Sequence, residues 1–444
     1  MMNEELLQFI WRERLFYDQN LRCTNGKKLE IVKVGKHNLN SGPDFFNAEI
    51  KLDDLTLVGN IEIHTKSSHW LDHNHQKDKA YNNVILHVVL EDNKEVYSES
   101  RRLLDTLIID QYLYDSINLS LSKLELNEDR EICSSSLAKF SKVRKYAFLD
   151  SLMIKRLKRK TESLSKAKED LSMGWLKLFL YSLFSSVGSP VNAIPMERLA
   201  SLIDINVLLK RRNEYQDIEA YVFGLSGFLS QQNSDLYFQK LKKRYAYLKV
   251  KYGIESEMEI HEWKYSRMRY HSFPVKRIGE LISLLCVRVD DLLSWMEEPT
   301  INNIDKFFSF HILPYWKSHY DFGKKIKSKN KGYTPSFKIR LYLNSIVPFS
   351  LLYNKFRNIE FYETELMSLP VEANKSIEKW KSKSFEIRNS WDSQAILELE
   401  KSYCNEKKCL NCTIGKSILK DEQVVYKNKR VFGDPVFWSL PMVG

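Results

Sequence analysis

Carboxylates and basic side chains lie at a spacing that suits metal chemistry in residues 43–66. Asp44 follows a Gly-Pro turn just ahead of an expected strand, and Glu62, His64 and Lys66 alternate along the next one. In an extended strand, residues i, i+2 and i+4 share one face, so these three side chains are expected to project together. Two carboxylates on adjoining strands can hold one Mg²⁺ ion, and a nearby basic group can orient the attacking water. We therefore predict Mg²⁺ bound by Asp44 and Glu62, with His64 or Lys66 assisting.

This arrangement resembles the PD-(D/E)XK nuclease pattern, which is an aspartate, a spacer and then Glu/Asp-x-Lys on the next strand. Here the pattern is Pro43-Asp44, 17 intervening residues and then Glu62-Ile63-His64. Histidine stands where the pattern has lysine. His64 could replace that lysine chemically, or Lys66 could take its role.

The resemblance covers roughly residues 1–95. It implies a restriction-endonuclease-like fold and phosphodiester cleavage. It also implies a further acidic residue on the preceding helix, for which Glu4 or Glu5 is available. The alternative interpretation is a half-buried strand whose polar groups are satisfied by ordinary hydrogen bonds.

A second set of possible ligands lies in residues 59–78, which hold four of the chain's ten histidines. An H-x-H pair with a further histidine and a carboxylate can bind Zn²⁺ or Mn²⁺. The spacing matches no specific zinc motif, so a polar loop is the alternative. His87 lies in an apolar strand and reads as a core histidine, yet it could support Glu62 if the two strands pair. The candidate ligands of this set are His69, His73, His75 and Asp78.

Three cysteines lie close together near the other end of the chain. Cys404, Cys409 and Cys412 form a C-x4-C-x2-C arrangement, and C-x2-C gives the bite that Zn²⁺ or an iron–sulfur cluster needs. A fourth ligand is required, and Cys133 is the best candidate. The alternative is packed thiols without metal.

The elements that must position these residues divide the chain into two parts. Strands are expected at 29–34, 48–52, 55–64 and 83–92, after an N-terminal helix at 3–17. From about residue 140 helical periodicity dominates, beginning with one long amphipathic helix at 143–171. We predict an α/β module with a small mixed sheet over 1–130, and a mainly α-helical body over 131–444. Further helices are expected around 174–186, 196–212, 215–229, 234–250, 275–297, 337–356 and 390–403.

Charge is unevenly distributed along the chain. Residues 1–100 carry 12 Lys and Arg against 16 Asp and Glu, a net charge of −4. Because the whole chain has a net charge of +11, the remaining residues carry +15. A basic body beside an acidic module fits a protein that holds a polyanion such as DNA or RNA. Arg267, Arg269 and Arg277 alternate with aromatic residues and are the candidate nucleic-acid contacts. A helix corner with arginines reaching water is the alternative.

The composition limits the compartment. No run approaches the roughly 18 apolar residues of a membrane helix, and the N-terminus has acidic residues where a signal peptide needs basic ones. Six scattered cysteines do not form a disulfide framework. We expect a cytoplasmic protein that does not bind membranes; the oligomeric state cannot be predicted.

Several strings resemble one bacterial family, domain of unknown function 2851. They are "FIWRERLF", "GPDFFNAEI", "GNIEIHTKSSHW" with the following histidines, "AYNNVILHVV", "FP" before "RI", and "WDSQA" before the cysteines. The family brings no established activity. The leading hypothesis is therefore a Mg²⁺-dependent nuclease-like phosphodiesterase. The alternatives are a non-catalytic nucleic-acid-binding or scaffold protein with a structural metal at its cysteines, and a His-ligated zinc hydrolase.

Overall fold

The computed structural model describes residues 4–16, 20–127, 131–288, 292, 299–327, 330–382 and 386–421. The chain forms two compact units. The first contains residues 1–149, 373–386 and 396–444, and the second contains 150–372 and 387–395. The first unit thus joins the expected α/β module to the cysteine-rich segment.

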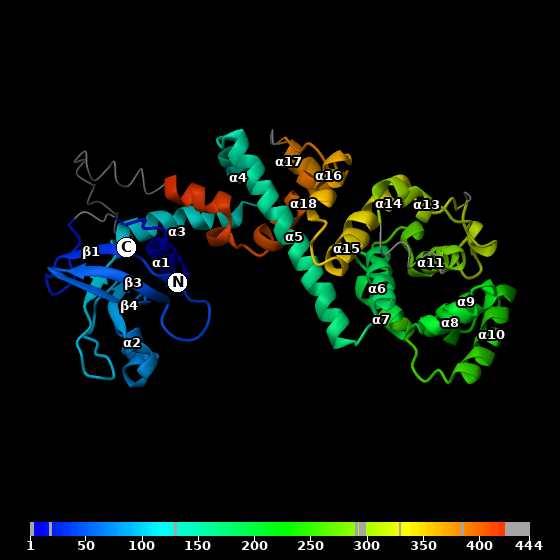
Figure 1. Cartoon of the computed structure of the whole chain (residues 1–444), viewed down its shortest axis with the longest axis horizontal. Coiled ribbons are helices and arrows are strands. Elements are labelled where there is room, and N and C mark those ends of the chain that lie inside the picture. The colour runs from blue at the N-terminus through cyan, green and yellow to red at the C-terminus, as the bar shows by residue number, and fades with distance from the viewer. Residues whose placement is uncertain are drawn as a thin grey trace, which may run out of the picture. The chain divides into compact units, whose positions relative to one another are not determined.

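A six-stranded mixed sheet forms the first unit, with strand order β1-β3-β4-β5-β6 and β2 paired to β3 (Figure 1). β1, β3 and β4 are antiparallel, whereas β4, β5 and β6 run parallel. Gly59 allows β4 to approach β5, because a Cβ there would lie 2.4 Å from Ile85 Cγ2. The strands are β1 (Leu29–Lys33), β2 (Lys36–His37), β3 (Phe45–Leu52), β4 (Leu55–Ile63), β5 (Val84–Val89) and β6 (Thr106–Ile108).

Two hydrophobic clusters form in the first unit. The larger joins α1 (Glu4–Arg12), α3 (Gln111–Leu126) and the apolar side chains of the sheet, Ile61 and Ile63 among them. The smaller contains Trp70, Tyr81, Val84, Val96 and Leu104. Successive side chains of β4 point to opposite faces of the sheet, so Ile61 and Ile63 pack in the larger core and Glu62 lies on the other face.

The last described residues complete the larger core. Leu410 and Leu419 belong to it, and Glu13, just after α1, forms ion pairs with Lys416 and Lys420. The other helical elements of this unit are α2 (His69–Asp72), α4 (Glu131–Ala138), α17 (Lys375–Lys381) and the turns Glu400–Cys404 and Cys409–Asn411.

Helices build the second unit. α5 (Lys142–Asp170) begins in the first unit and continues here, and a two-stranded sheet of β7 (His319–Asp321) and β8 (Lys324–Lys325) lies late in the unit. The remaining helices are α6 (Trp175–Gly188), α7 (Ala193–Leu202), α8 (Ile205–Lys210), α9 (Tyr215–Leu225), α10 (Leu236–Tyr252), α11 (Pro274–Arg288), α13 (Ile304–Phe307), α14 (Pro335–Leu341), α15 (Val347–Tyr353), α16 (Ile359–Ser368) and α18 (Ser390–Leu399), the last shared with the first unit.

A π-helical turn, Tyr342–Ile346, joins α14 to α15 where one uninterrupted helix was expected. Pro348 lacks an N–H and cannot donate to the carbonyl of Asn344, four residues earlier. Lys160 Nζ donates to that carbonyl instead, at 3.5 Å. The wide turn is thus the local response to a proline inside a helical sequence.

The fold class predicted from the sequence is confirmed, since a mixed sheet in the N-terminal region precedes a mainly helical body. In the part of the chain that the structure describes, none of the helices combines the length and apolar character needed to cross a membrane.

Candidate metal and hydrolase site

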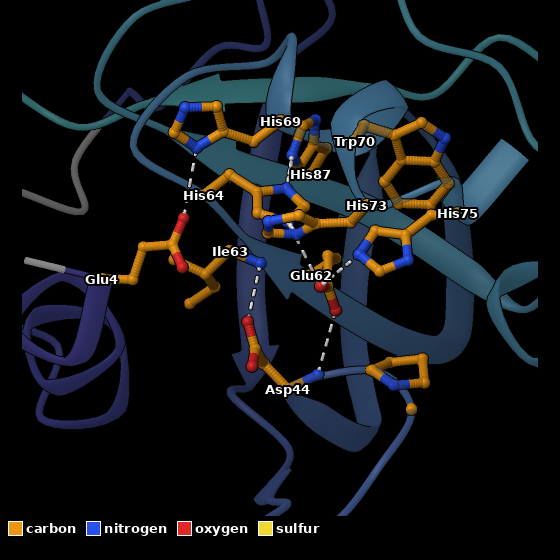
Figure 2. Close-up of polar contacts among 12 residues, drawn as sticks. Glu4, Asp44, Glu62, Ile63, His64, His69, Trp70, His73, His75 and His87 are labelled. Atoms are coloured by element: carbon orange, nitrogen blue, oxygen red, sulfur yellow. Dashed lines mark hydrogen bonds and ion pairs between the residues drawn. The ribbon is translucent and has the colours of Figure 1, made fainter.

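Asp44, immediately before β3, and Glu62, near the end of β4, lie against each other at the end of this strand pair that is opposite its turn. The Asp44 backbone N–H donates to Glu62 Oε2 at 3.1 Å, and the Ile63 N–H donates to Asp44 Oδ2 at 3.0 Å. Gln8 on α1 donates to Asp44 Oδ1 at 2.8 Å. The two carboxylates predicted to share a cation are therefore neighbours, held by both strands and by α1 (Figure 2).

Burial and mutual charge change the acidity of this pair. Burial, followed by the charge of Glu62, raises the pKa of Asp44 to about 7. Burial, with a further contribution from Glu4, raises the pKa of Glu62 to about 8, against the hydrogen bond from the Asp44 N–H. A divalent cation at this position would reverse this effect, because a positive charge favours the ionised carboxylates.

His64 and His87 continue the site from the ends of neighbouring strands. β4 and β5 pair in parallel with Glu62 opposite His87, and His64 Nδ1 lies 2.9 Å from His87 Nε2. Burial, followed by the neighbouring histidines, lowers the pKa of His64 to about 2, and burial lowers the pKa of His87 to about 3. Both rings are therefore neutral at physiological pH, which is the form that binds metals.

A tight chain reversal after β4 brings two more imidazoles to His64. The short helix α2 ends at Asp72, and His73 is its C-cap. Asn74 then adopts a left-handed conformation with φ 61° before the turn His75–Lys77. Trp70 anchors the reversal, since its buried ring donates from Nε1 to the Tyr97 carbonyl at 3.0 Å. His75 stacks on Tyr81 with ring centroids 3.8 Å apart.

Three ring nitrogens converge as a result. The ligand atoms of His64, His73 and His75 all lie within 4.8 Å of one another, and His64 Nε2 is 3.1 Å from His73 Nδ1 (Figure 2). Glu62 Oε1 faces the same point, 3.6 Å from His64 Nε2 and 3.3 Å from His75 Nε2. His75 Nε2 is buried without a hydrogen-bond partner.

These separations match the requirements of a first-row transition metal. Ligands at about 2.1 Å from a tetrahedral ion lie about 3.4 Å apart. The His64 and His73 nitrogens, 3.1 Å apart, lie near that value, and all three histidine nitrogens lie within 4.8 Å of one another. Imidazole nitrogen together with carboxylate oxygen suits Zn²⁺ and Mn²⁺. The buried His75 nitrogen makes no hydrogen bond although Glu62 Oε1 lies 3.3 Å away, and a metal ion would satisfy such an atom.

A family model described as a protein of unknown function, DUF2851, matches residues 4–376. The chain belongs to the DUF2851 family. The match covers every residue of the site just described and confirms the resemblance to this family. The resemblance of the N-terminal module to PD-(D/E)XK nucleases stays a prediction. No curated protein and no solved structure matches the chain.

The remaining predicted residues of this DUF2851 site take different positions. β4 ends at Ile63, and Lys66 pairs with Glu91 at 2.8 Å instead of lying beside Asp44. His69 Nδ1 lies 3.4 Å from Glu4 Oε1, at the more exposed side of the histidines. Asp78 caps the turn Lys79–Tyr81 by accepting from the Ala80 N–H.

The sequence analysis missed three supporting residues, Gln8, Trp70 and Tyr81. Gln8 lies four residues after Glu4, a spacing that places both on one side of α1 and would have pointed to it. Trp70 and Tyr81 gave no such signal, because their contact with His75 depends on the turn at Asn74.

The predicted cysteine ligands belong to the first unit. Cys133 lies in α4, and Cys133 and Cys409 both pack against the larger core, beside Leu410. The backbone of Cys409 is close to Gly415, where a Cβ would lie 2.3 Å from the Cys409 carbonyl oxygen. Cys404, Cys409 and Cys412 follow the end of the family match at residue 376. A metal at these thiols stays a prediction.

The predicted nucleic-acid contacts lie in the second unit. Arg267 and Arg269 are exposed, whereas Arg277 is half-buried in the first turn of α11. Arg277 Nη1 donates to Glu280 at 2.8 Å, and its guanidinium lies over the Phe337 ring. Nucleic-acid binding by these residues stays a prediction.

Proposed function

We propose that this protein is a metal-dependent hydrolase in which His64, His73 and His75 hold a Zn²⁺ or Mn²⁺ ion. The observation that carries the proposal is the convergence of three ring nitrogens within 4.8 Å beside the buried Glu62 carboxyl. Three protein ligands leave a coordination position open for water, as catalytic zinc sites require.

Glu62 is the group placed to work on that water. Its Oε1 faces the nitrogens of His64 and His75, and its Oε2 is held by the Asp44 N–H. His64, His73 and His75 would hold the ion, which would lower the pKa of a bound water toward about 7. Glu62, once ionised, would be the group that accepts a proton from that water, and the Asp44 N–H holds Glu62 in position.

The substrate class to test first is a phosphodiester of DNA or RNA. Hydrolysis of such a bond needs a metal-activated water and stabilisation of charge on the phosphoryl oxygens, both of which the proposed ion supplies. The net charge of +15 beyond residue 100 supports a polyanionic substrate.

The first experiment measures metal binding directly. The protein, stripped of metal by a chelator, is titrated with Zn²⁺, Mn²⁺ and Mg²⁺ by calorimetry, alongside His73→Ala. His73 is exposed, so its removal should leave folding intact. His261→Ala is the matched control, because that side chain is 76% exposed and lies in the other unit. Loss of Zn²⁺ or Mn²⁺ binding in His73→Ala alone supports the site; equal binding in all three proteins refutes it.

A second candidate function is a Mg²⁺-dependent nuclease that uses Asp44 and Glu62 as its cation ligands. The adjacency of the two carboxyl groups, through the 3.1 Å hydrogen bond, favours it. Cleavage of labelled DNA and RNA with each ion separates the two mechanisms. Mg²⁺-dependent cleavage that survives His73→Ala but not Asp44→Asn supports this second candidate. Nucleic-acid binding without cleavage under any ion would leave a binding or scaffold protein.

A further inference from the structure

Two guanidinium groups of the second unit share one aromatic ring. Arg277, on α11, has its Cζ atom 4.1 Å from the centroid of Phe337, and Arg340, on α14, has its Cζ atom 4.5 Å from the same centroid. The two Cζ atoms therefore lie no more than 8.6 Å apart, the sum of those distances. Two like charges are thus held close together on the helices labelled α11 and α14 (Figure 1).

Acidic groups do not balance this charge. Glu280 is fully buried and pairs with both Lys276 and Arg277, so one carboxylate serves two cations. The Arg340 guanidinium makes no hydrogen bond or ion pair within the described residues, and its Nε is buried without an acceptor. Its pKa is lowered by burial and then by the charge of Arg277, against an opposing contribution from Glu372.

A second donor near the ring also lacks a partner. Tyr333 packs against Phe337 with ring centroids 4.9 Å apart, and its buried hydroxyl has no hydrogen-bond partner. Arg340 is half-buried, and partly burying a cation that forms no ion pair is costly. Buried donors without acceptors, such as Arg340 Nε and the Tyr333 hydroxyl, are rare in native proteins. An anion with several acceptor oxygens would relieve the cost at Arg340.

We propose that Arg277 and Arg340 form a binding site for a phosphate group. The guanidinium fork donates in parallel to two phosphate oxygens, a geometry that a lysine cannot reproduce. The phosphate belongs either to a nucleic-acid backbone or to a small phosphate compound, and both present the same oxygens. The site lies wholly within the second unit and does not depend on the metal site of the first.

The test compares the wild-type protein with Arg340→Met and Arg340→Lys. Binding of inorganic phosphate, of a nucleoside 5′-monophosphate and of a single-stranded oligonucleotide is measured by calorimetry, with acetate at matched ionic strength as the control anion. We expect phosphate binding to weaken roughly 10- to 100-fold in Arg340→Met, the range that hydrogen bonds to charged groups provide. Arg340→Lys should restore part of the affinity, because it keeps the charge without the fork.

A melting experiment guards against a merely structural role for Arg340. Phosphate should raise the melting temperature of the wild type and not that of Arg340→Met. Without phosphate, Arg340→Met should be at least as stable as the wild type, because it removes a half-buried charge that forms no ion pair within the described residues. If Arg340→Met does not fold, the proposal is tested by the phosphate affinity of Arg340→Lys and by the comparison of phosphate with acetate on the wild type.

Each outcome is informative. Binding of inorganic phosphate identifies a small-phosphate site, whereas binding of the oligonucleotide alone identifies a backbone contact. The proposal is overturned if acetate acts as strongly as phosphate, if none of the three phosphate probes binds the wild type, or if Arg340→Met and the wild type bind equally.

Discussion

Replacing Glu219 with glutamine should change how the stability of the second unit depends on pH. Glu219 lies on α9 and is fully buried. It accepts hydrogen bonds from the Tyr237 hydroxyl and from Trp316 Nε1, each at 2.5 Å. Burial raises its pKa from 4.5 to about 7, although both hydrogen bonds act in the opposite direction.

The direction of the pH dependence of stability follows from whether the folded or the unfolded chain holds the Glu219 proton more tightly. Between pH 4.5 and 7 the folded protein keeps the Glu219 proton while the unfolded chain releases it, so rising pH favours unfolding. Below pH 4.5 both states are protonated, and above pH 7 both are ionised. Each pH unit across this interval changes the free energy of unfolding by about 1.4 kcal/mol. The wild type should therefore lose roughly 3 kcal/mol of stability between pH 4.5 and pH 7.

The glutamine variant removes this dependence while preserving the contacts. Its carbonyl oxygen can accept from Trp316, and its amide can donate to the Tyr237 hydroxyl oxygen. The assay is denaturant unfolding of both proteins at pH 5 and at pH 7.5. The difference between the two proteins is the quantity of interest, because all other titrating groups cancel. Glu219→Gln should gain roughly 2 to 3 kcal/mol relative to the wild type on going to pH 7.5. If the stability difference between Glu219→Gln and the wild type is the same at pH 5 and at pH 7.5, Glu219 does not hold its proton in the folded state, and the reasoning is refuted.

Three further changes test other parts of the structure. Gly224→Ala should destabilise the second unit by about 1–3 kcal/mol in denaturant unfolding, because the added Cβ would lie 2.1 Å from the Tyr245 ring. Glu13→Gln should cost less than about 1 kcal/mol above pH 5, and progressively less as the pH falls below 4.5. The pKa of Glu13 is lowered, since its two lysine partners outweigh burial, so its stabilising effect is lost as pH falls. His87→Ala should weaken Zn²⁺ binding about 10- to 100-fold by calorimetry, because it removes the neighbour that orients His64.

Matched substitutions control these three measurements. Gly174→Ala adds a methyl group where nothing lies within 4 Å, so it should not show the loss at Gly224. Lys416→Gln should reproduce part of the Glu13 effect. His261→Ala should bind Zn²⁺ like the wild type. For Gly224 and His87, equal effects of the substitution and its control would contradict the prediction. For Glu13, a Lys416→Gln variant with no effect on stability would contradict it.

Local patterns predicted much of the fold. Apolar alternation located β1, β4 and β5, and helical periodicity located α5 (Lys142–Asp170) almost to its ends. The predicted neighbours Asp44 and Glu62 do meet, because strand phase and an antiparallel pairing of β3 with β4 were sufficient to bring them together.

Other parts of the site depended on information that periodicity does not contain. The convergence of His73 and His75 requires a left-handed residue at Asn74 and the packing of Trp70. Lys66 left the predicted face because β4 ends three residues earlier and Glu91 offers a partner. Such effects arise from tertiary contacts and chain reversals.

Residues from both ends of the described chain build the core of the first unit, so this core can be completed only late in synthesis. Leu410 and Leu419 belong to the same core as α1, and Lys416 and Lys420 form ion pairs with Glu13. A chain still being translated therefore carries an unfinished N-terminal core until the ribosome has passed residue 419. The second unit, encoded between these parts, can fold first. A chain truncated after the family match at residue 376 would leave apolar surface of the first unit uncovered. Such a truncated chain is expected to be prone to aggregation.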